Sequence, residues 1–205
     1  MGSVIGCAGS DQDSDAILAF YYNEEGSSDH RFYETESVNV ANDDFSNYTQ
    51  IGLENAPFFN GSLGVFTRFS ENEKWLILTY ELDGEIKISN PIRSKQNTQP
   101  TVYTEIITID QSTSQMPDFS WTDDPFDQNA IYFQVITDNQ NNIVSGTYTF
   151  ENRFQYYDIS NVVLNITRGT PPDLDLGVDY NFTLMDVSVD SWVNFLTLNQ
   201  NFTIK

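Results

Sequence analysis

Residues 74–88 read KWLILTYELDGEIKI, and this stretch decides the fold class. Leu76, Leu78 and Tyr80 stand at every second position, which is the pattern of a β-strand that buries one face. Asp83-Gly84 is a strong turn signal, and the residues after it supply a second strand. The stretch therefore predicts an antiparallel hairpin inside an all-β fold.

The length of the hairpin loop has two alternatives. A two-residue loop, Asp83-Gly84, places Tyr80 opposite Lys87, whereas a three-residue loop that begins at Leu82 places Tyr80 opposite Ile86. Only the three-residue loop gives one continuous apolar face. We therefore expect the three-residue loop.

The same alternation recurs through the first half of the chain, and helical periodicity is absent from the sequence pattern. Strands are expected near residues 16–22, 62–69, 75–82 and 85–89. Between them, residues 23–60 are polar and show no clear strand. A stretch of that length is commonly functional, so we expect a binding surface there.

The second half predicts seven strands, and seven short strands in about 105 residues are typical of an immunoglobulin-like or fibronectin-type sandwich. They are expected at residues 102–109, 119–121, 131–137, 143–150, 161–167, 180–187 and 192–204. The polar stretch 89–100, with a proline near each end, predicts a linker. We place a domain boundary near residue 95, with one continuous sandwich as the alternative. The expected domains are an N-terminal tether over 1–15, a β domain over 16–95 and a sandwich over 96–205.

Two short motifs in the second half resemble those of fibronectin type III domains. Residues 176–182, LGVDYNF, are similar to the leucine, glycine and tyrosine spacing of a tyrosine corner, in which the hydroxyl of Tyr180 would bind backbone groups. Phe119-Ser120-Trp121 resembles the tryptophan-bearing second strand of that family. The resemblance covers residues 100–205, with a longer corner loop at Pro171-Pro172-Asp173. It implies a fold and no function.

The single cysteine, Cys7, follows Val4-Ile5-Gly6, and these four residues resemble a bacterial lipobox. In that motif the cysteine is acylated and becomes the first residue of the mature protein. Only three residues precede the motif, so we expect a truncated signal. The resemblance implies a lipid anchor on Cys7.

The acidic run after Cys7 contains Asp11, Asp13 and Asp15. It is similar to the export signal of surface lipoproteins of Bacteroidota. The resemblance implies a protein that is lipid-anchored in the outer membrane and exposed on the cell surface. A solvated tether is the plainer interpretation of the same residues, and both can hold.

The charge of the chain excludes one class of partner. The sequence has 9 basic and 30 acidic residues among 205, which gives a net charge of −21. Such a chain repels nucleic acid, so we expect no nucleic-acid partner. No apolar run of about 18 residues is present to span a bilayer as a helix, so attachment to a membrane would depend on Cys7.

Candidates for chemistry are few. Asp11, Asp13 and Asp15 have the start of a calcium-loop spacing, but Ala16 and Tyr22 stand where the EF-hand requires glycine and glutamate. Calcium could still bind one of two acidic clusters, formed by Asp123, Asp124 and Asp127 or by Asp173, Asp175 and Asp179. His30 is the only histidine, which excludes multi-histidine zinc sites. We expect no metal site, no cofactor and no enzymatic activity.

Two aromatic pairs are the candidate ligand-binding rings, because strand alternation does not assign them to a core. They are Phe58-Phe59, which follows Pro57, and Tyr156-Tyr157, which lies in an expected loop. We expect a non-enzymatic accessory or ligand-capturing subunit of an outer-membrane complex, such as a transporter. The alternative is a free-standing module that binds surface glycans or mediates adhesion. An accessory subunit should expose a large apolar patch, and a glycan binder should have a groove with rings beside carboxylates and amides.

Overall fold

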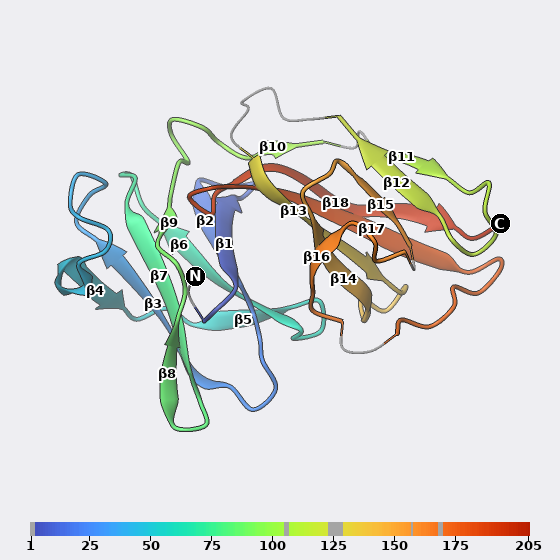
Figure 1. The fold of residues 1–205 in the computed structure, drawn as a ribbon. Helices are drawn as coiled ribbons and strands as arrows, with labels where there is room; N and C mark the ends of the chain where they lie inside the picture. The colour runs from blue at the N-terminus through green and yellow to red at the C-terminus, as the bar shows by residue number, and fades with distance from the viewer. Residues whose placement is uncertain (1–2, 105–106, 123–128, 157, 168–169) are drawn as a thin grey trace. The chain divides into compact units, whose positions relative to one another are not determined.

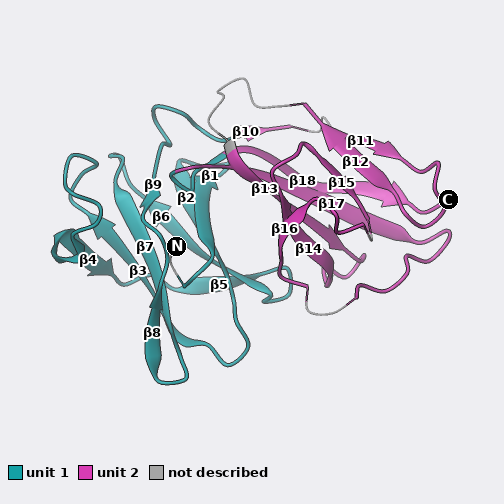
Figure 2. Ribbon diagram, viewed as in Figure 1, with its two compact units in different colours: residues 1–101, 190–193 teal, residues 102–189, 194–205 magenta. Residues whose placement is uncertain are grey.

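The computed structural model describes residues 3–104, 107–122, 129–156, 158–167 and 170–205. These ranges contain eighteen strands and a short 3-10 turn at Phe45–Asn47, which confirms the all-β prediction (Figure 1). The chain divides into two compact units (Figure 2). Unit 1 comprises residues 1–101 and 190–193, and unit 2 comprises residues 102–189 and 194–205.

Unit 1 is a sandwich of two antiparallel sheets. One sheet has the order β1-β2-β6-β5, formed by Gly6–Ser10, Ala16–Tyr22, Leu63–Phe69 and Asn55–Phe58. The other has the order β4-β3-β7-β8, formed by Tyr48–Ile51, Ser28–Thr35, Trp75–Leu82 and Glu85–Ile88. A short strand, β9 (Ile92–Arg93), also pairs with β7. These are the A-B-E-D and C′-C-F-G orders of an immunoglobulin-like sandwich.

The core of unit 1 follows from the strand alternation. Leu76, Leu78 and Tyr80 of β7 all point into one cluster of buried side chains. Phe66 of β6 reaches the same cluster from the facing sheet, and Phe32 of β3 packs beside its ring. Burial of large side chains is the main source of stability in a domain that has no disulfide.

The β7–β8 hairpin has the two-residue loop, so the expected three-residue loop is wrong. Tyr80 lies opposite Lys87, and Leu82 lies opposite Glu85. Both loop residues have positive φ, 55° at Asp83 and 76° at Gly84, as a type I′ turn requires. The turn matches the twist of the strands, and β8 is an edge strand whose side chains do not need to reach the core.

Two stretches expected to lack strands contain them. Residues 23–60 hold β3, β4 and β5, because pairing with the apolar strands β7 and β6 orders a polar sequence. The expected N-terminal tether is also wrong in part, since Gly6–Ser10 form β1, with Cys7 opposite Phe20 of β2. Small side chains permit this strand to lie close to its neighbours. A Cβ at Gly9 would stand 2.8 Å from Thr101 Oγ1.

The expected linker at residues 89–100 is an ordered part of unit 1. Ile92 is fully buried in the core of the unit, and the division between units follows Thr101 instead of residue 95. Trp192, predicted to open the last strand of the second domain, is buried in the core of unit 1, and its Nε1 donates a hydrogen bond to Gln99 O (2.8 Å). Lys95 also binds Asp190, with 2.9 Å between Nζ and Oδ2.

Unit 2 is a second sandwich. Its smaller sheet has the order β11-β12-β15, formed by Ile107–Asp110, Asp118–Trp121 and Arg153–Gln155. Its larger sheet has the order β10-β18-β17-β13-β14-β16, formed by Val102–Tyr103, Val193–Thr203, Asp179–Ser188, Asn129–Thr137, Ile143–Thr149 and Val162–Asn165. Without its edge strands β10 and β16, this is the A-B-E and G-F-C-C′ arrangement of a fibronectin type III or immunoglobulin-like domain.

The two motifs in unit 2 occupy the predicted places. Trp121 and Phe119 of β12 lie in the core, and the rings of Phe119 and Phe182 stack at 4.1 Å between centroids. Tyr180 is the second residue of β17, and its hydroxyl accepts a hydrogen bond from the backbone N–H of Asp175 (3.1 Å). The leucine that anchors this corner in the core is Leu174, which is fully buried, and not the exposed Leu176.

The strand expected at residues 102–109 is two strands, β10 and β11, which belong to different sheets. Strand β15 was not predicted, because only Phe154 of its three residues is buried. No helix in the described ranges has the length and hydropathy needed to cross a membrane.

Candidate functional site

A hollow opens at one end of unit 1. It has a volume of about 760 Å³, which lies within the usual range for ligand pockets. Three segments that are distant in sequence build it: the β1–β2 turn, the end of β6 with the residues after it, and the segment before Thr101. Its lining residues are Ser10, Asp11, Gln12, Ser14, Asp15, Ala16, Phe69, Ser70, Glu71, Gln96, Asn97 and Pro100.

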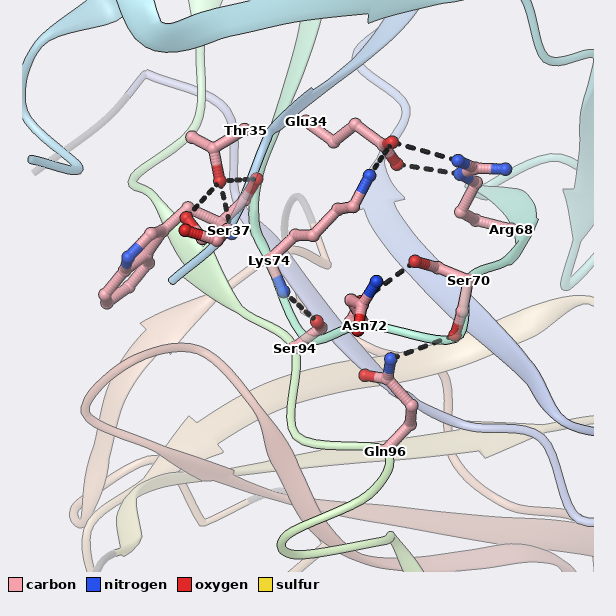
Figure 3. A network of polar contacts seen from close by, with 10 residues as sticks. Glu34, Thr35, Ser37, Arg68, Ser70, Asn72, Lys74, Ser94 and Gln96 are labelled. Carbon is pink, nitrogen blue, oxygen red and sulfur yellow. Dashed lines mark hydrogen bonds and ion pairs between the residues drawn. The ribbon is translucent and has the colours of Figure 1, made fainter. Parts of the chain in front are cut away.

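Hydrogen bonds join the second and third segments of the hollow. Glu73 accepts hydrogen bonds from the backbone N–H of Asn97 (3.2 Å) and from both the N–H and the hydroxyl of Thr98 (2.7 Å each). Gln96 Nε2 donates to Ser70 O at 3.2 Å (Figure 3). These contacts fix the two loops in a defined shape, so the hollow is formed before any ligand arrives.

The first of the three segments, the β1–β2 turn, is ordered by its own polar side chains. Ser14 Oγ donates to Asp11 Oδ2 (2.6 Å), and Asp11 N–H donates to Ala16 O (2.8 Å). Ser10 N–H donates to Thr101 Oγ1 (2.8 Å), which ties this turn to the third segment. All three walls of the hollow are therefore held by hydrogen bonds.

The hollow combines an apolar ring with polar residues. Phe69 is 62% exposed, which is high for a phenylalanine at the end of a core strand. Three acidic residues, Asp11, Asp15 and Glu71, and the amide residue Gln96 line the hollow together with Phe69. Within the described part of the chain, Gln96 Oε1 is buried and accepts no hydrogen bond. A buried acceptor without a partner carries a cost in stability.

Beside the hollow, a cluster of three charged side chains links the two sheets of unit 1 (Figure 3). Glu34 of β3 accepts hydrogen bonds from Arg68 Nε (2.7 Å) and Nη2 (2.9 Å), and it also pairs with Lys74. Burial by itself raises the pKa of Glu34, but the hydrogen bonds and charges of Arg68 and Lys74 outweigh it, so that the pKa is lowered. The cluster holds β6 against β3 where β6 leads into the hollow, and it is a structural element.

Cys7 lies in a strand and not on a free terminal segment. Its side chain is half-buried, and burial raises the pKa of the thiol to about 12. Val4, three residues before it, is buried in the core of unit 1, and its N–H donates to Ile88 O (3.2 Å). Cleavage before Cys7 would remove these contacts. Lipidation of Cys7 stays a prediction, and cleavage at this position would cost the stability that the contacts of Val4 provide.

The predicted export-signal aspartates lie at the β1–β2 turn. Asp13 and Asp15 are exposed, and Asp11 is half-buried. Two of the three, Asp11 and Asp15, line the hollow. A role in export stays a prediction, while the geometry gives these two carboxylates a place in the candidate site.

The aromatic pairs predicted to form a ligand surface do not do so in the described residues. Phe59 and Tyr156 are buried, so their expected exposure is wrong. Phe58 is half-buried and packs against Phe20 and Phe59, with centroids 5.2 and 4.4 Å apart. Tyr156 is held in the core of unit 2, where its hydroxyl donates to Pro172 O. Tyr157 lies outside the described residues.

The other candidates for chemistry do not form a site. Among the described residues, no three acidic, histidine or cysteine side chains are close enough to hold a metal ion. Of the two acidic clusters considered for calcium, the one at residues 123–127 lies outside the described ranges. His30 is half-buried and stacks on Tyr21 at 5.1 Å, with its Nε2 3.0 Å from Asn23 Oδ1.

Sequence reasoning missed the residues that define the hollow. Phe69 is the last residue of the strand expected at 62–69 and was not proposed as a ligand-binding ring, and Gln96 lies in a stretch interpreted as a linker. The only signal for Phe69 was its place before the polar run Ser70-Glu71-Asn72, at the point where a strand ends. No sequence signal brings residues 10–16, 69–71 and 96–100 together.

Comparisons with known proteins give no family. No protein-family model matches the chain, and no curated protein sequence matches it. Among solved structures, the whole chain aligns with 98% of a segment of two fibronectin type III domains from chicken tenascin, at 14% identity and a TM-score of 0.27. A TM-score this low does not establish a common fold. The description of the two units as sandwiches therefore rests on their own strand orders and cores.

Proposed function

We propose that this chain is a non-enzymatic carbohydrate-binding protein whose binding site is the hollow of unit 1. The observation that carries the proposal is the exposed ring of Phe69 in a pre-formed hollow beside carboxylates and amides. The C–H face of a sugar ring is apolar and packs on an aromatic ring, while its hydroxyls bind carboxylate and amide groups. This combination is what a glycan-binding groove was expected to show.

The test compares two exposed phenylalanines of unit 1. Phe69→Ala removes the ring in the hollow, and Phe45→Ala removes a ring that is 56% exposed but does not line the hollow. Binding of the parent and both variants is measured on a glycan array and then by calorimetry with the best glycan. Loss of one ring contact should weaken binding about tenfold in Phe69→Ala only. Equal loss in both variants, or no glycan bound by the parent, would contradict the proposal.

One observation favours a role as an accessory subunit. Four exposed apolar side chains occur near the edge strand β16 of unit 2, namely Phe150, Ile159, Val163 and Leu164. Exposed apolar side chains at the edge of a sheet are candidates for a protein contact. Affinity purification of a tagged chain from detergent-solubilised membranes, with Leu164→Lys as the comparison, tests this role. A stoichiometric partner lost in the variant would support it, and recovery of the chain alone would count against it.

We also propose that the protein acts at the outer membrane, exposed on the cell surface and anchored through Cys7. The lipobox-like residues before Cys7 support this location, while the burial of Val4 counts against cleavage there. Metabolic labelling with a fatty-acid analogue distinguishes the two outcomes. Label that is present in the parent and absent from Cys7→Ala supports the anchor, and equal labelling of both refutes it.

A further inference from the structure

The charge of the hollow restricts the class of glycan that it can bind. Asp11, Asp15 and Glu71 give the lining three carboxylates, and no lysine, arginine or histidine is among its described residues. Arg68, which precedes Phe69 in β6, and Lys74 both pair with Glu34. A negatively charged ligand would therefore meet carboxylates without a compensating cation, in a chain whose net charge is −21.

The hydrogen-bonding capacity of the hollow leads to the same restriction. Asp11, Asp15 and Glu71 line the hollow, and their ionised carboxylates accept hydrogen bonds and cannot donate them. A matching ligand must therefore supply donors. Hydroxyl groups supply donors, whereas carboxylate and sulfate groups supply acceptors only.

We propose that the hollow selects uncharged, hydroxyl-rich glycans and rejects their carboxylated or sulfated counterparts. This inference rests on the carbohydrate-binding function proposed above. Phe69 accounts for the affinity for a sugar ring of either kind. The three carboxylates of the lining account for the preference between them.

The first experiment is an array that carries uncharged glycans together with carboxylated and sulfated glycans of the same backbones. We expect the parent protein to bind uncharged members at least ten times more tightly than their anionic counterparts. The preference should weaken as the salt concentration rises, because ions screen charges at the mouth of an open hollow. Equal or tighter binding of anionic members would overturn the inference and leave the carbohydrate-binding function intact. Binding of no member would overturn both.

A pair of triple variants tests whether the lining itself makes the selection. Asp11→Asn/Asp15→Asn/Glu71→Gln removes three charges from the hollow, and Glu25→Gln/Asp43→Asn/Glu81→Gln removes three exposed charges of unit 1 that do not line it. Net charge changes equally in both. The first variant should gain at least tenfold in binding anionic glycans, and the second should resemble the parent.

Two results of that comparison decide the origin of the selectivity. An equal gain in both triple variants would show that net charge alone excludes anions, and would overturn the assignment to the hollow. No gain in a first variant that still binds uncharged glycans would also overturn it. Thermal unfolding of each variant, followed by circular dichroism, confirms that the compared proteins are folded.

Discussion

Replacement of Glu34 by glutamine should destabilise unit 1 more than any other single loss of charge that we consider. The Glu34 side chain is 5% exposed and binds Arg68 of the facing sheet and Lys74, which directly precedes the neighbouring strand β7. Glutamine keeps the shape and one acceptor oxygen, so the variant removes the charge and little else. It leaves two cations facing each other without an anion between them.

The expected cost follows from the burial of the partners. Breaking a buried ion pair by removing one partner costs about 3–5 kcal/mol. The side chains of Arg68 and Lys74 are 25% and 17% exposed, so both can turn partly toward water in the variant. We therefore expect a loss of about 2–4 kcal/mol in the free energy of unfolding at pH 7.

The stability lost in Glu34→Gln should decrease as the pH falls. The ordinary pKa of the group is 4.5, and in the folded protein the pKa of Glu34 is lowered. The unfolded chain then binds more protons than the folded one as pH falls below 4.5, so this stabilisation is present above that value and is lost through the folded pKa. The difference between the parent and Glu34→Gln should be constant above pH 6 and should shrink below 4.5.

The measurement is urea unfolding in a Trp121→Phe background. Trp75 and Trp192 both belong to unit 1, so the remaining tryptophan fluorescence reports on that unit alone. Glu85→Gln is the matched control, because Glu85 pairs with Lys87 at the surface, where water screens the pair and its loss should change stability little. A Glu34→Gln variant that is as stable as the control at pH 7 would refute the reasoning, and so would a difference that does not change with pH.

Three further predictions concern single groups. Tyr180→Phe removes the acceptor of the Asp175 N–H and should cost unit 2 about 1–3 kcal/mol. Urea unfolding in a Trp75→Phe/Trp192→Phe background, where only Trp121 fluoresces, measures the cost, and an unchanged midpoint would contradict it. Burial raises the pKa of the Cys7 thiol to about 12. Iodoacetamide at pH 8 should therefore modify this thiol only after unfolding, because the thiolate is the reactive form. Rapid modification of the folded protein would show an accessible thiolate and contradict the prediction. Gly84→Ala places an L-residue at φ 76° and should cost about 1 kcal/mol, whereas a stability equal to the parent's would show that the turn rearranges.

The accuracy of the strand predictions depended on how much of each strand faces a core. β2 and β7 were predicted with their observed ends, because both carry apolar residues along their whole length. β1, β3 and β15 were missed, since few of their side chains are large and apolar. Backbone pairing with a neighbouring strand orders such segments, and pairing leaves no mark in the sequence of the segment itself.

The candidate site could not be predicted, although its residues are ordinary ones. Phe58, Phe59 and Tyr156 were chosen because strand alternation did not explain them, yet neighbouring rings and a carbonyl group enclose them. Phe69 was not predicted to be a ligand-binding ring, because it continues a strand in which apolar and polar residues alternate. Exposure of a ring depends on what the fold places over it, and that is a property of residues far away in sequence.

The sequence by itself determined the all-β class, the ends of the most apolar strands and the tyrosine corner at Tyr180, because alternation, turn residues and a short motif act over a few neighbouring positions. Tertiary structure alone decided that Trp192 joins unit 1 and that Phe69 and Gln96 meet at one hollow. These outcomes depend on contacts between segments up to about 90 residues apart, such as the bond from Trp192 to Gln99 O. Local patterns fix what each segment can bury, and only the packing of the sheets fixes what it meets.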